Sequence, residues 1–187
     1  VCSSDLFMDI SPNGKEIAIG CKSGNLHIYD AVTFEKKLTK NERKGQPIGS
    51  VKYSPEGNYL SVGGVDGMMF VYEPEANYKR SKKLIGHTSR VTHIDWSADG
   101  EFLQSNSTSY ELLYHNISNG TQVTKISSLK DTDWYNWTCV LGWPVQGIWP
   151  PCASGDDINA CDRDKRKKVL VTGDDFGKVK QIGRAHV

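Results

Sequence analysis

The carboxylates and imidazoles that could bind a metal ion are the first residues to consider. Four carboxylates gather in one stretch, at Asp156, Asp157, Asp162 and Asp164. Calcium loops place oxygen ligands at alternate positions ahead of a glycine, and this stretch lacks that Asp-x-Asp-x-Asp-Gly order. The histidines His87, His93 and His115 fall where turns or strands are expected. We therefore predict a solvated acidic loop, and neither a metal nor a cofactor.

Motifs that activate a nucleophile or hold a phosphate are missing from the sequence. It contains no G-x-S-x-G, no phosphate-binding glycine loop and no H-E-x-x-H. Some β-propellers are glycosidases, but Ser97-Ala-Asp-Gly100 lacks the spacing and the tryptophan of the sialidase aspartate box. Cys21, Cys139, Cys152 and Cys161 form no disulfide framework and are expected to be free thiols. The sequence predicts a protein that binds without catalysis.

Three clusters of basic residues could attract an acidic partner through charge complementarity. Two of them, within 36–44 and 79–83, fall in expected outer strands, where lysines also discourage pairing with another sheet edge. The third lies in an expected long loop and is the best candidate for a partner surface. It consists of Arg163, Lys165, Arg166, Lys167 and Lys168. Because acidic residues interleave with the basic ones, we favour an ordinary solvated surface for these clusters.

Four tryptophans stand close together before and within the same expected loop. They are Trp134, Trp137, Trp143 and Trp149. Exposed aromatic side chains could form a hot spot for a partner protein. Large apolar side chains gain most from burial, however, so we favour a role in anchoring the loop onto the body of the protein.

Composition excludes two classes of partner. The chain of 187 residues has 23 Lys and Arg against 22 Asp and Glu, and this balance argues against a dedicated nucleic-acid binder. No run of about 18 apolar residues is present, so no membrane span is expected. With 37% hydrophobic residues and 18 glycines, the chain has enough apolar material for a globular core.

A repeat of 43 residues supplies the elements that must position these side chains. An alternating strand precedes each of three turns, Ser11-Pro-Asn-Gly14, Ser54-Pro-Glu-Gly57 and Ser97-Ala-Asp-Gly100. Proline fixes φ in such turns and glycine tolerates positive φ. A second strand, a second turn, a third strand and a polar fourth strand are expected after each turn. Four short strands at this period predict blades of a WD-type β-propeller.

The fourth repeat is interrupted. Val169-Leu-Val-Thr-Gly173-Asp-Asp175 resembles the second strand and turn of a blade, but aligning Gly173 with Gly64 leaves 23 extra residues. We expect them in an inserted loop at 144–168. The predicted fold class is all-β, a fragment of a WD-repeat propeller with three four-stranded blades plus an interrupted fourth. The expected repeats are 7–43, 44–86, 87–129 and 130–181.

Several motifs together resemble the echinoderm microtubule-associated protein-like family. Gly86-His87 followed by Asp95-Trp96 matches the start of a WD repeat, and Asp66 matches the turn aspartate. The more specific motifs are Thr138-Cys-Val-Leu-Gly142, Asp157-Ile-Asn159 and Thr172-Gly-Asp-Asp175-Phe-Gly-Lys-Val. The resemblance covers most of 7–180 and fits the second of the family's two tandem propellers. The repeat positions expected to be structural are Gly14, Asp30, Gly57, Asp66, Gly67, Gly86, His87, Asp95, Trp96, Gly100 and Asp175.

The resemblance implies a non-catalytic protein of the cytoplasm and cytoskeleton that binds tubulin, microtubules and other proteins. It does not identify the contacting residues. Ser23 and Ser109 replace the turn aspartate, which puts the buried His–Asp network of WD repeats in question in most blades. The alternative function is that of a WD-repeat scaffold subunit in another complex, such as a ligase receptor or a ciliary assembly.

The two ends of the sequence are expected to be translated sequencing adapter. One DNA segment, read on opposite strands, can encode both Val1-Cys-Ser-Ser-Asp-Leu6 and Ile182-Gly-Arg-Ala-His186. We therefore expect residues 1–6 and 182–187 to lack packing partners, and residues 7–181 to be a partial propeller with exposed blade edges.

Overall fold

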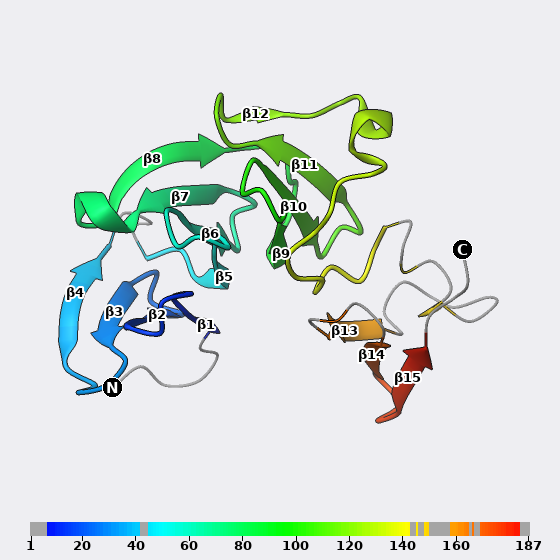
Figure 1. The fold of residues 1–187 in the computed structure, drawn as a ribbon, viewed down its shortest axis with the longest axis horizontal. Coiled ribbons are helices and arrows are strands. Elements are labelled where there is room, and N and C mark those ends of the chain that lie inside the picture. The colour runs from blue at the N-terminus through cyan, green and yellow to red at the C-terminus, as the bar shows by residue number, and fades with distance from the viewer. Residues whose placement is uncertain are drawn as a thin grey trace.

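Four antiparallel sheets surround a common centre as an open arc (Figure 1). The structure is a computed structural model and describes residues 7–41, 45–142, 145, 148–149, 158–164, 166 and 169–183. In every sheet the strands lie in sequence order, with the first strand nearest the centre. We call these sheets blades 1 to 4. The predicted fold class, a WD-type propeller fragment with three four-stranded blades and an incomplete fourth, is confirmed.

The blades have the following strands. Blade 1 contains β1 (Phe7–Ile10), β2 (Glu16–Gly20), β3 (Leu26–Asp30) and β4 (Lys36–Lys40). Blade 2 contains β5 (Ile48–Tyr53), β6 (Leu60–Gly64), β7 (Met69–Glu73) and β8 (Lys79–Leu84), with the short 3₁₀ turn η1 (Pro74–Ala76) before β8. Blade 3 contains β9 (Val91–Trp96), β10 (Phe102–Ser107), β11 (Leu112–Asn116) and β12 (Thr121–Gln122), followed by η2 (Ile126–Leu129). Blade 4 contains β13 (Ile158–Arg163), β14 (Val169–Asp174) and β15 (Val179–Gly183).

The predicted turns between first and second strands form as expected. The backbone N–H of Gly14, Gly57 and Gly100 donates to the carbonyl of Ser11, Ser54 and Ser97, respectively, and all three glycines have positive φ. The serine hydroxyl closes the turn from its other side, since Ser54 Oγ accepts from the backbone N–H of Tyr59 at 3.0 Å. The turn motif thus uses both its serine and its glycine.

Hydrophobic cores lie between neighbouring blades, where one sheet packs on the next. The core between blades 2 and 3 joins Met69, Val71 and Leu84 to Val91, Ile94 and Leu103. Neighbouring blades approach each other so closely at one repeat position that the position requires glycine. A Cβ on Gly20 would lie 2.4 Å from Ile48 Cγ2, and one on Gly63 would lie 2.6 Å from Val91 Cγ1. The corresponding residue of blade 4 is Gly173, and nothing lies within 4 Å of a Cβ built there.

The connection from blade 3 to blade 4 differs from the prediction. Residues 158–163 of the expected insertion form β13, so that part of the predicted loop is wrong. The strand register pairs Trp96 with Leu103 and Arg163 with Leu170. Trp96 and Arg163 are therefore equivalent and lie 67 residues apart, so the connection is 24 residues longer than the repeat. The predicted alignment of Gly173 with Gly64, which left 23 extra residues, is thus wrong by one residue, since the register aligns Gly173 with Gly63. The extra residues precede β13 and do not interrupt the blade.

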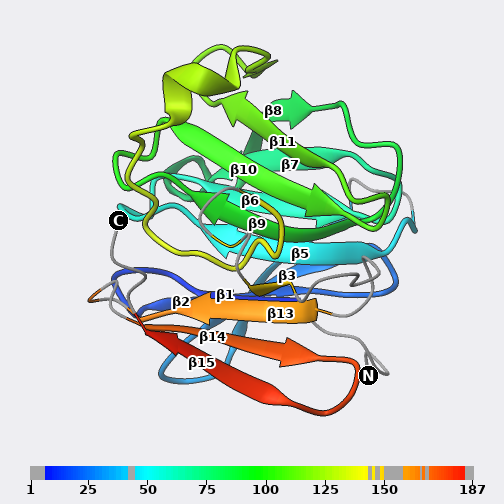
Figure 2. The ribbon, with the colours of Figure 1, turned by 90° about the vertical axis from the view of Figure 1, so that its right-hand side faces the viewer.

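The fourth strand of blade 3 is short, and the connection to blade 4 starts directly after it. β12 has two residues, whereas β4 has five and β8 has six. After β12 the chain passes through η2 and descends across blade 3 to the end of β9 (Figure 2). There Tyr135 N–H donates to the Trp96 carbonyl, and Ser97 forms a bridge with Trp134.

The faces of blades 1 and 4 at the two ends of the arc are only partly covered. Met8 and Ile10, the alternating apolar residues of β1, are 57% and 52% exposed. At the other end, Ile182 pairs with Leu170 and packs against the blade 3–4 core. The expectation that the ends lack packing partners is therefore wrong for Ile182, and residues 1–6 and 184–187 lie outside the described residues. Among the described residues, no helix has the length and hydrophobicity that a membrane span requires.

Candidate protein-interaction site

The residue before the last in β9, the first strand of blade 3, is Asp95, which is 0% exposed. Its oxygens accept hydrogen bonds from a neighbouring strand and from the loop that follows η2. The donors are Gln104 Nε2 at 3.1 Å, Asn136 Nδ2 at 2.9 Å, Thr138 N and Oγ1 at 2.8 Å, and Cys139 N at 2.9 Å. We call Asp95 with Asn136, Thr138 and Cys139 the Asp95 clasp. A buried carboxylate surrounded by donors holds the loop in place.

Trp96 connects the same strand to blade 2. Its indole Nε1 donates to Lys52 O at 3.2 Å and to Ser61 Oγ at 3.1 Å. The Tyr59 ring stacks on it, with centroids 6.1 Å apart and an angle of 9° between the planes. The adjacent residues Asp95 and Trp96 thus bond to both neighbours: Asp95 to the loop toward blade 4, and Trp96 to blade 2.

Trp134 and Trp137 are buried between blades 3 and 4, as the anchoring interpretation predicts. Their rings meet edge to face at 6.2 Å. Arg163, the first residue of the predicted partner surface, belongs to this packing. Its guanidinium donates to the Trp134 carbonyl and lies 5.7 Å from the centroid of the Trp137 ring. Arg166 is exposed, whereas Lys165, Lys167 and Lys168 lie outside the described residues, as does Trp143.

His87 forms a hydrogen-bond network that the sequence analysis did not find. Its Nδ1 lies 3.0 Å from Glu111 Oε2 and its Nε2 lies 2.7 Å from Ser105 Oγ. Because a carboxylate only accepts, Nδ1 carries the proton and donates it. Glu111 thus supplies the carboxylate two residues after Ser109, which replaces the turn aspartate. The sequence signal that could have identified Glu111 is a carboxylate close to the expected turn but outside the motif position.

The remaining predicted turn residues are used locally. Asp30 accepts from the N–H of Val32 and Thr33, and these two bonds, with one from Lys37, lower the pKa of its carboxyl to about 2. Asp66 accepts from Met68 N–H at 3.2 Å. In blade 4 the side chain that closes the turn is Asp174, which accepts from Phe176 N and Lys178 N. Asp175 instead accepts a hydrogen bond from Asn159.

The second residue before each third strand lies in a left-handed turn. Gly24, Gly67 and Gly177 occupy this position with φ of 82°, 74° and 71°, and Tyr110 occupies it in blade 3 with φ of 59°. A side chain in this conformation costs roughly 1–2 kcal/mol, so glycine is the usual residue. Tyr110 is 52% exposed and borders a cavity of about 370 Å³ between blades 3 and 4.

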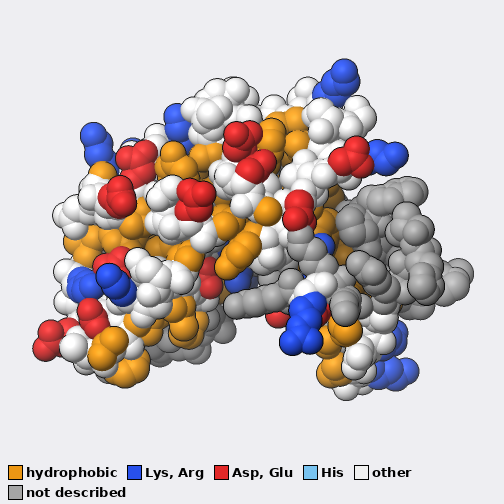
Figure 3. Space-filling model, in the orientation of Figure 1, with side chains coloured by type: hydrophobic (Ala, Val, Ile, Leu, Met, Phe, Trp, Pro, Cys, Tyr) orange, Lys and Arg blue, Asp and Glu red, His pale blue; other side chains and the backbone are white. Residues whose placement is uncertain are grey.

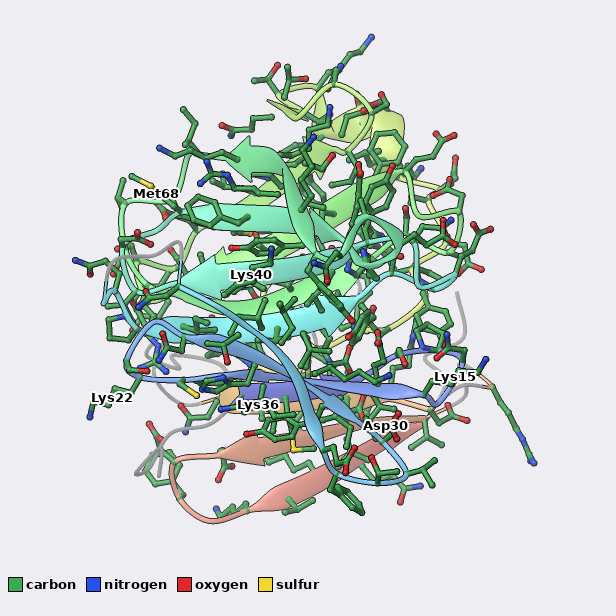
Figure 4. The ribbon with its side chains drawn as sticks, turned by 90° about the vertical axis from the view of Figure 1, so that its left-hand side faces the viewer. Lys15, Lys22, Asp30, Lys36, Lys40 and Met68 are labelled. Atoms are coloured by element: carbon green, nitrogen blue, oxygen red, sulfur yellow. The ribbon has the colours of Figure 1, made fainter. Side chains whose placement is uncertain are left out.

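Charge is distributed unevenly over the surface. The turns after β5 and β9 carry the exposed residues Glu56, Asp99 and Glu101, which line one surface depression, and we call this surface the acidic face. Figure 3 shows Asp and Glu side chains across the face toward the viewer. Lysines instead occupy the outer strands, and Figure 4 shows Lys36 and Lys40 on β4. Lys37 is engaged by Glu16 and Asp30, both at 3.2 Å. The outer edge and the acidic face therefore offer different electrostatic surfaces to a partner.

The thiols and acidic residues give no sign of metal or redox chemistry in the described part of the chain. Cys21, Cys139 and Cys161 are buried free thiols, as predicted, and Cys152 lies outside the described residues. Burial and the nearby Asp95 raise the pKa of Cys161 to about 12. No group of three His, Cys, Asp or Glu residues suited to a metal is present among the described residues. Asp164, one of the four clustered carboxylates, closes the turn after β13 by accepting from Val169 N–H at 2.8 Å.

Comparison with known families agrees with this architecture. Residues 6–182 match the family described as "Echinoderm microtubule-associated protein second beta-propeller". The chain belongs to the echinoderm microtubule-associated protein family. Within this family, echinoderm microtubule-associated protein-like 1 of Rattus norvegicus is 40% identical over 171 residues, which are 90% of this chain and 21% of that protein. Echinoderm microtubule-associated protein-like 4 of Homo sapiens is 39% identical over 175 residues, covering 91% of this chain and 18% of that protein.

This member of the echinoderm microtubule-associated protein family spans about a fifth of the length of those relatives. Among solved structures, the crystal structure of the computationally designed Ika4 protein has a TM-score of 0.60 at 14% identity. The similarity covers 97% of this chain and 92% of that one, and at this identity it supports the fold alone.

In this echinoderm microtubule-associated protein propeller, Glu111→Gln is expected to lower stability in a pH-dependent way. Burial opposes ionisation of Glu111, but hydrogen bonds from Ser107, Thr88 and His87 outweigh it and lower the pKa of its carboxyl to about 2. The unfolded carboxyl titrates near 4.3. The ionised Glu111 carboxylate therefore makes its full contribution to the free energy of unfolding above about pH 4.3, and this contribution is lost as the pH falls toward 2.

Urea unfolding at a series of pH values measures this effect. We expect the variant to be less stable by about 1 kcal/mol at pH 7, with the difference shrinking below about pH 4.5. A difference that stayed constant down to pH 2.5 would show that the Glu111 charge does not stabilise the fold.

Proposed function

We propose that this chain is part of a non-catalytic, microtubule-associated scaffold of the cytoplasm and that it binds tubulin through its surface. The observation that carries the proposal is the match of residues 6–182 to the second propeller of the echinoderm microtubule-associated protein family. The names of its relatives describe them as microtubule-associated protein-like. Asp95 and His87 are buried groups of types that enzymes use in acid–base chemistry, but both are occupied by structural hydrogen bonds. This supports a role in binding without catalysis.

The outer edge of blades 1 and 2 is the surface that we propose for an acidic polymer. Lys36 on β4 and Lys79 and Lys83 on β8 are exposed there. The acidic face around Glu56 and Glu101 is a less suitable surface for this polymer, because like charges repel each other. The basic run that begins at Arg163 is a weaker candidate than its sequence suggests, since Arg163 itself is held by Trp134 and Trp137.

Co-sedimentation of the protein with assembled microtubules tests the proposal. The variant Lys79→Glu/Lys83→Glu is expected to bind about tenfold more weakly than the wild type, because two attractive surface contacts become repulsive. Glu56→Gln/Glu101→Gln changes the acidic face by the same number of residues and is expected to bind like the wild type. Arg166→Glu tests the blade 4 loop.

The pelleted fraction distinguishes the possibilities. If Arg166→Glu is the only variant that loses binding, the contact lies in the blade 4 loop and not on the outer edge of blades 1 and 2. Failure of the wild type to pellet, with recovery in another stable complex, would contradict the microtubule proposal and favour a WD-repeat subunit of that complex.

A further inference from the structure

Tyr110 is the feature that points to a second binding site. It occupies a left-handed turn position where the other three blades have glycine. About half of the residue remains exposed, so burial compensates only in part for the unfavourable backbone conformation. Strained residues of this kind concentrate at functional sites.

The neighbouring blades show why a side chain fits at this turn in blade 3. A Cβ on Gly24 would lie 2.8 Å from the Gln46 carbonyl oxygen, and one on Gly67 would lie 2.5 Å from the His87 carbonyl oxygen. Both oxygens belong to the short link that leads to the next blade. The link after blade 3 is longer, and its residues 133–139 lie along the end of β9, where the Asp95 clasp holds them.

The cavity beside Tyr110 has a defined chemistry. Its volume is about 370 Å³, and its walls come from blade 3, blade 4 and the loop between them. Val140 and Leu141 provide an apolar side, and Asp175 provides a carboxylate. Burial lowers the pKa of His93, which also borders the cavity, so this imidazole is uncharged at neutral pH. Asp175 and Asn159 are exposed, which leaves the cavity open to a partner.

We propose that this cavity binds an arginine side chain of a partner protein. The guanidinium lies over the Tyr110 ring and pairs with the Asp175 carboxylate, and the aliphatic part of the side chain contacts Val140 and Leu141. Arginine suits this site better than lysine, because its planar cation stacks on aromatic rings and donates several hydrogen bonds in one plane. The site lies at the turns opposite the acidic face and is independent of the proposed tubulin surface.

Saturation-transfer NMR on the protein with the peptide acetyl-Gly-Arg-Gly-amide tests the site. The matching citrulline peptide has the same shape without the charge and is the ligand control. We expect saturation transfer to the arginine side chain, and binding of the citrulline peptide at least fivefold weaker. Asp175→Asn is expected to weaken arginine binding by a similar factor, because it removes the opposing charge.

Tyr110→Gly separates a binding role from a packing role. It installs the residue that the other blades use, so we expect an unchanged or higher melting temperature together with at least tenfold weaker peptide binding. Phe34→Gly is the matched control, because Phe34 is also exposed at a positive φ, in the turn between β3 and β4. It should bind the peptide like the wild type.

Three results would overturn the proposal. They are the absence of saturation transfer in the wild type, equal binding of the arginine and citrulline peptides, and full binding by Tyr110→Gly. A lower melting temperature of Tyr110→Gly with unchanged binding would identify Tyr110 as a packing residue.

Discussion

Replacing Asp95 by asparagine is expected to lower the free energy of unfolding by about 3 kcal/mol or more. The carboxylate accepts from two backbone N–H groups, of Thr138 and Cys139, and from the side chains of Gln104, Asn136 and Thr138. An asparagine has the same shape but points an NH₂ group at donors, so some of them lose their acceptor in a dry environment. Urea unfolding at pH 7 measures the loss.

Blade 4 provides the matched control for this substitution. Asp162 stands at the position equivalent to Asp95, as the strand registers show, but its side chain is exposed. Asp162→Asn is therefore expected to change stability by less than about 0.5 kcal/mol. Thr138→Val removes one hydroxyl donor from the clasp and should cost about 1 kcal/mol. Similar losses in the Asp95 and Asp162 variants would contradict the clasp.

Gly63→Ala is expected to destabilise the protein by about 2 kcal/mol or more, because it forces blades 2 and 3 apart. The new Cβ would lie 2.6 Å from Val91 Cγ1 and 2.8 Å from Val91 Cβ. Rotating the valine moves the first atom but not the second, so β9 itself must shift. Thermal unfolding should show a lower melting temperature.

Gly173→Ala tests the same repeat position without a neighbouring blade. A Cβ there meets nothing within 4 Å. Alanine also costs less backbone entropy than glycine in a strand, so we expect a change between zero and a small gain in stability. A large loss at Gly173, or none at Gly63, would show that glycine serves the strand and not the contact between blades.

The local parts of the fold could be predicted from the sequence. The turns at Gly14, Gly57 and Gly100 follow from steric rules that act over four residues. The alternation of apolar residues in the first strands and the 43-residue interval then fix the order of the blades. Met8 and Ile10 follow the same alternation yet are exposed, because burial depends on whether another blade covers β1.

The long-range parts could not be predicted. The loop partners of Asp95, from Asn136 to Cys139, lie 41 to 44 residues later in the sequence, in the connection between blades 3 and 4. Arg163 is part of a basic run and looks like a surface residue, but its strand turns it toward Trp134 and Trp137. Glu111 replaces the turn aspartate from a different position, which a motif comparison by alignment misses. In each case the decisive contact joins residues that the sequence pattern treats as unrelated.

The Asp95 clasp also constrains the order of events during synthesis. A ribosome adds residues from the N-terminus, so β9 and β10 leave the exit tunnel well before Asn136, Thr138 and Cys139. Until those donors arrive, Asp95 can keep its charge solvated only if the end of β9 remains open to water. Blade 3 is therefore complete only after a segment beyond its own last strand has left the tunnel.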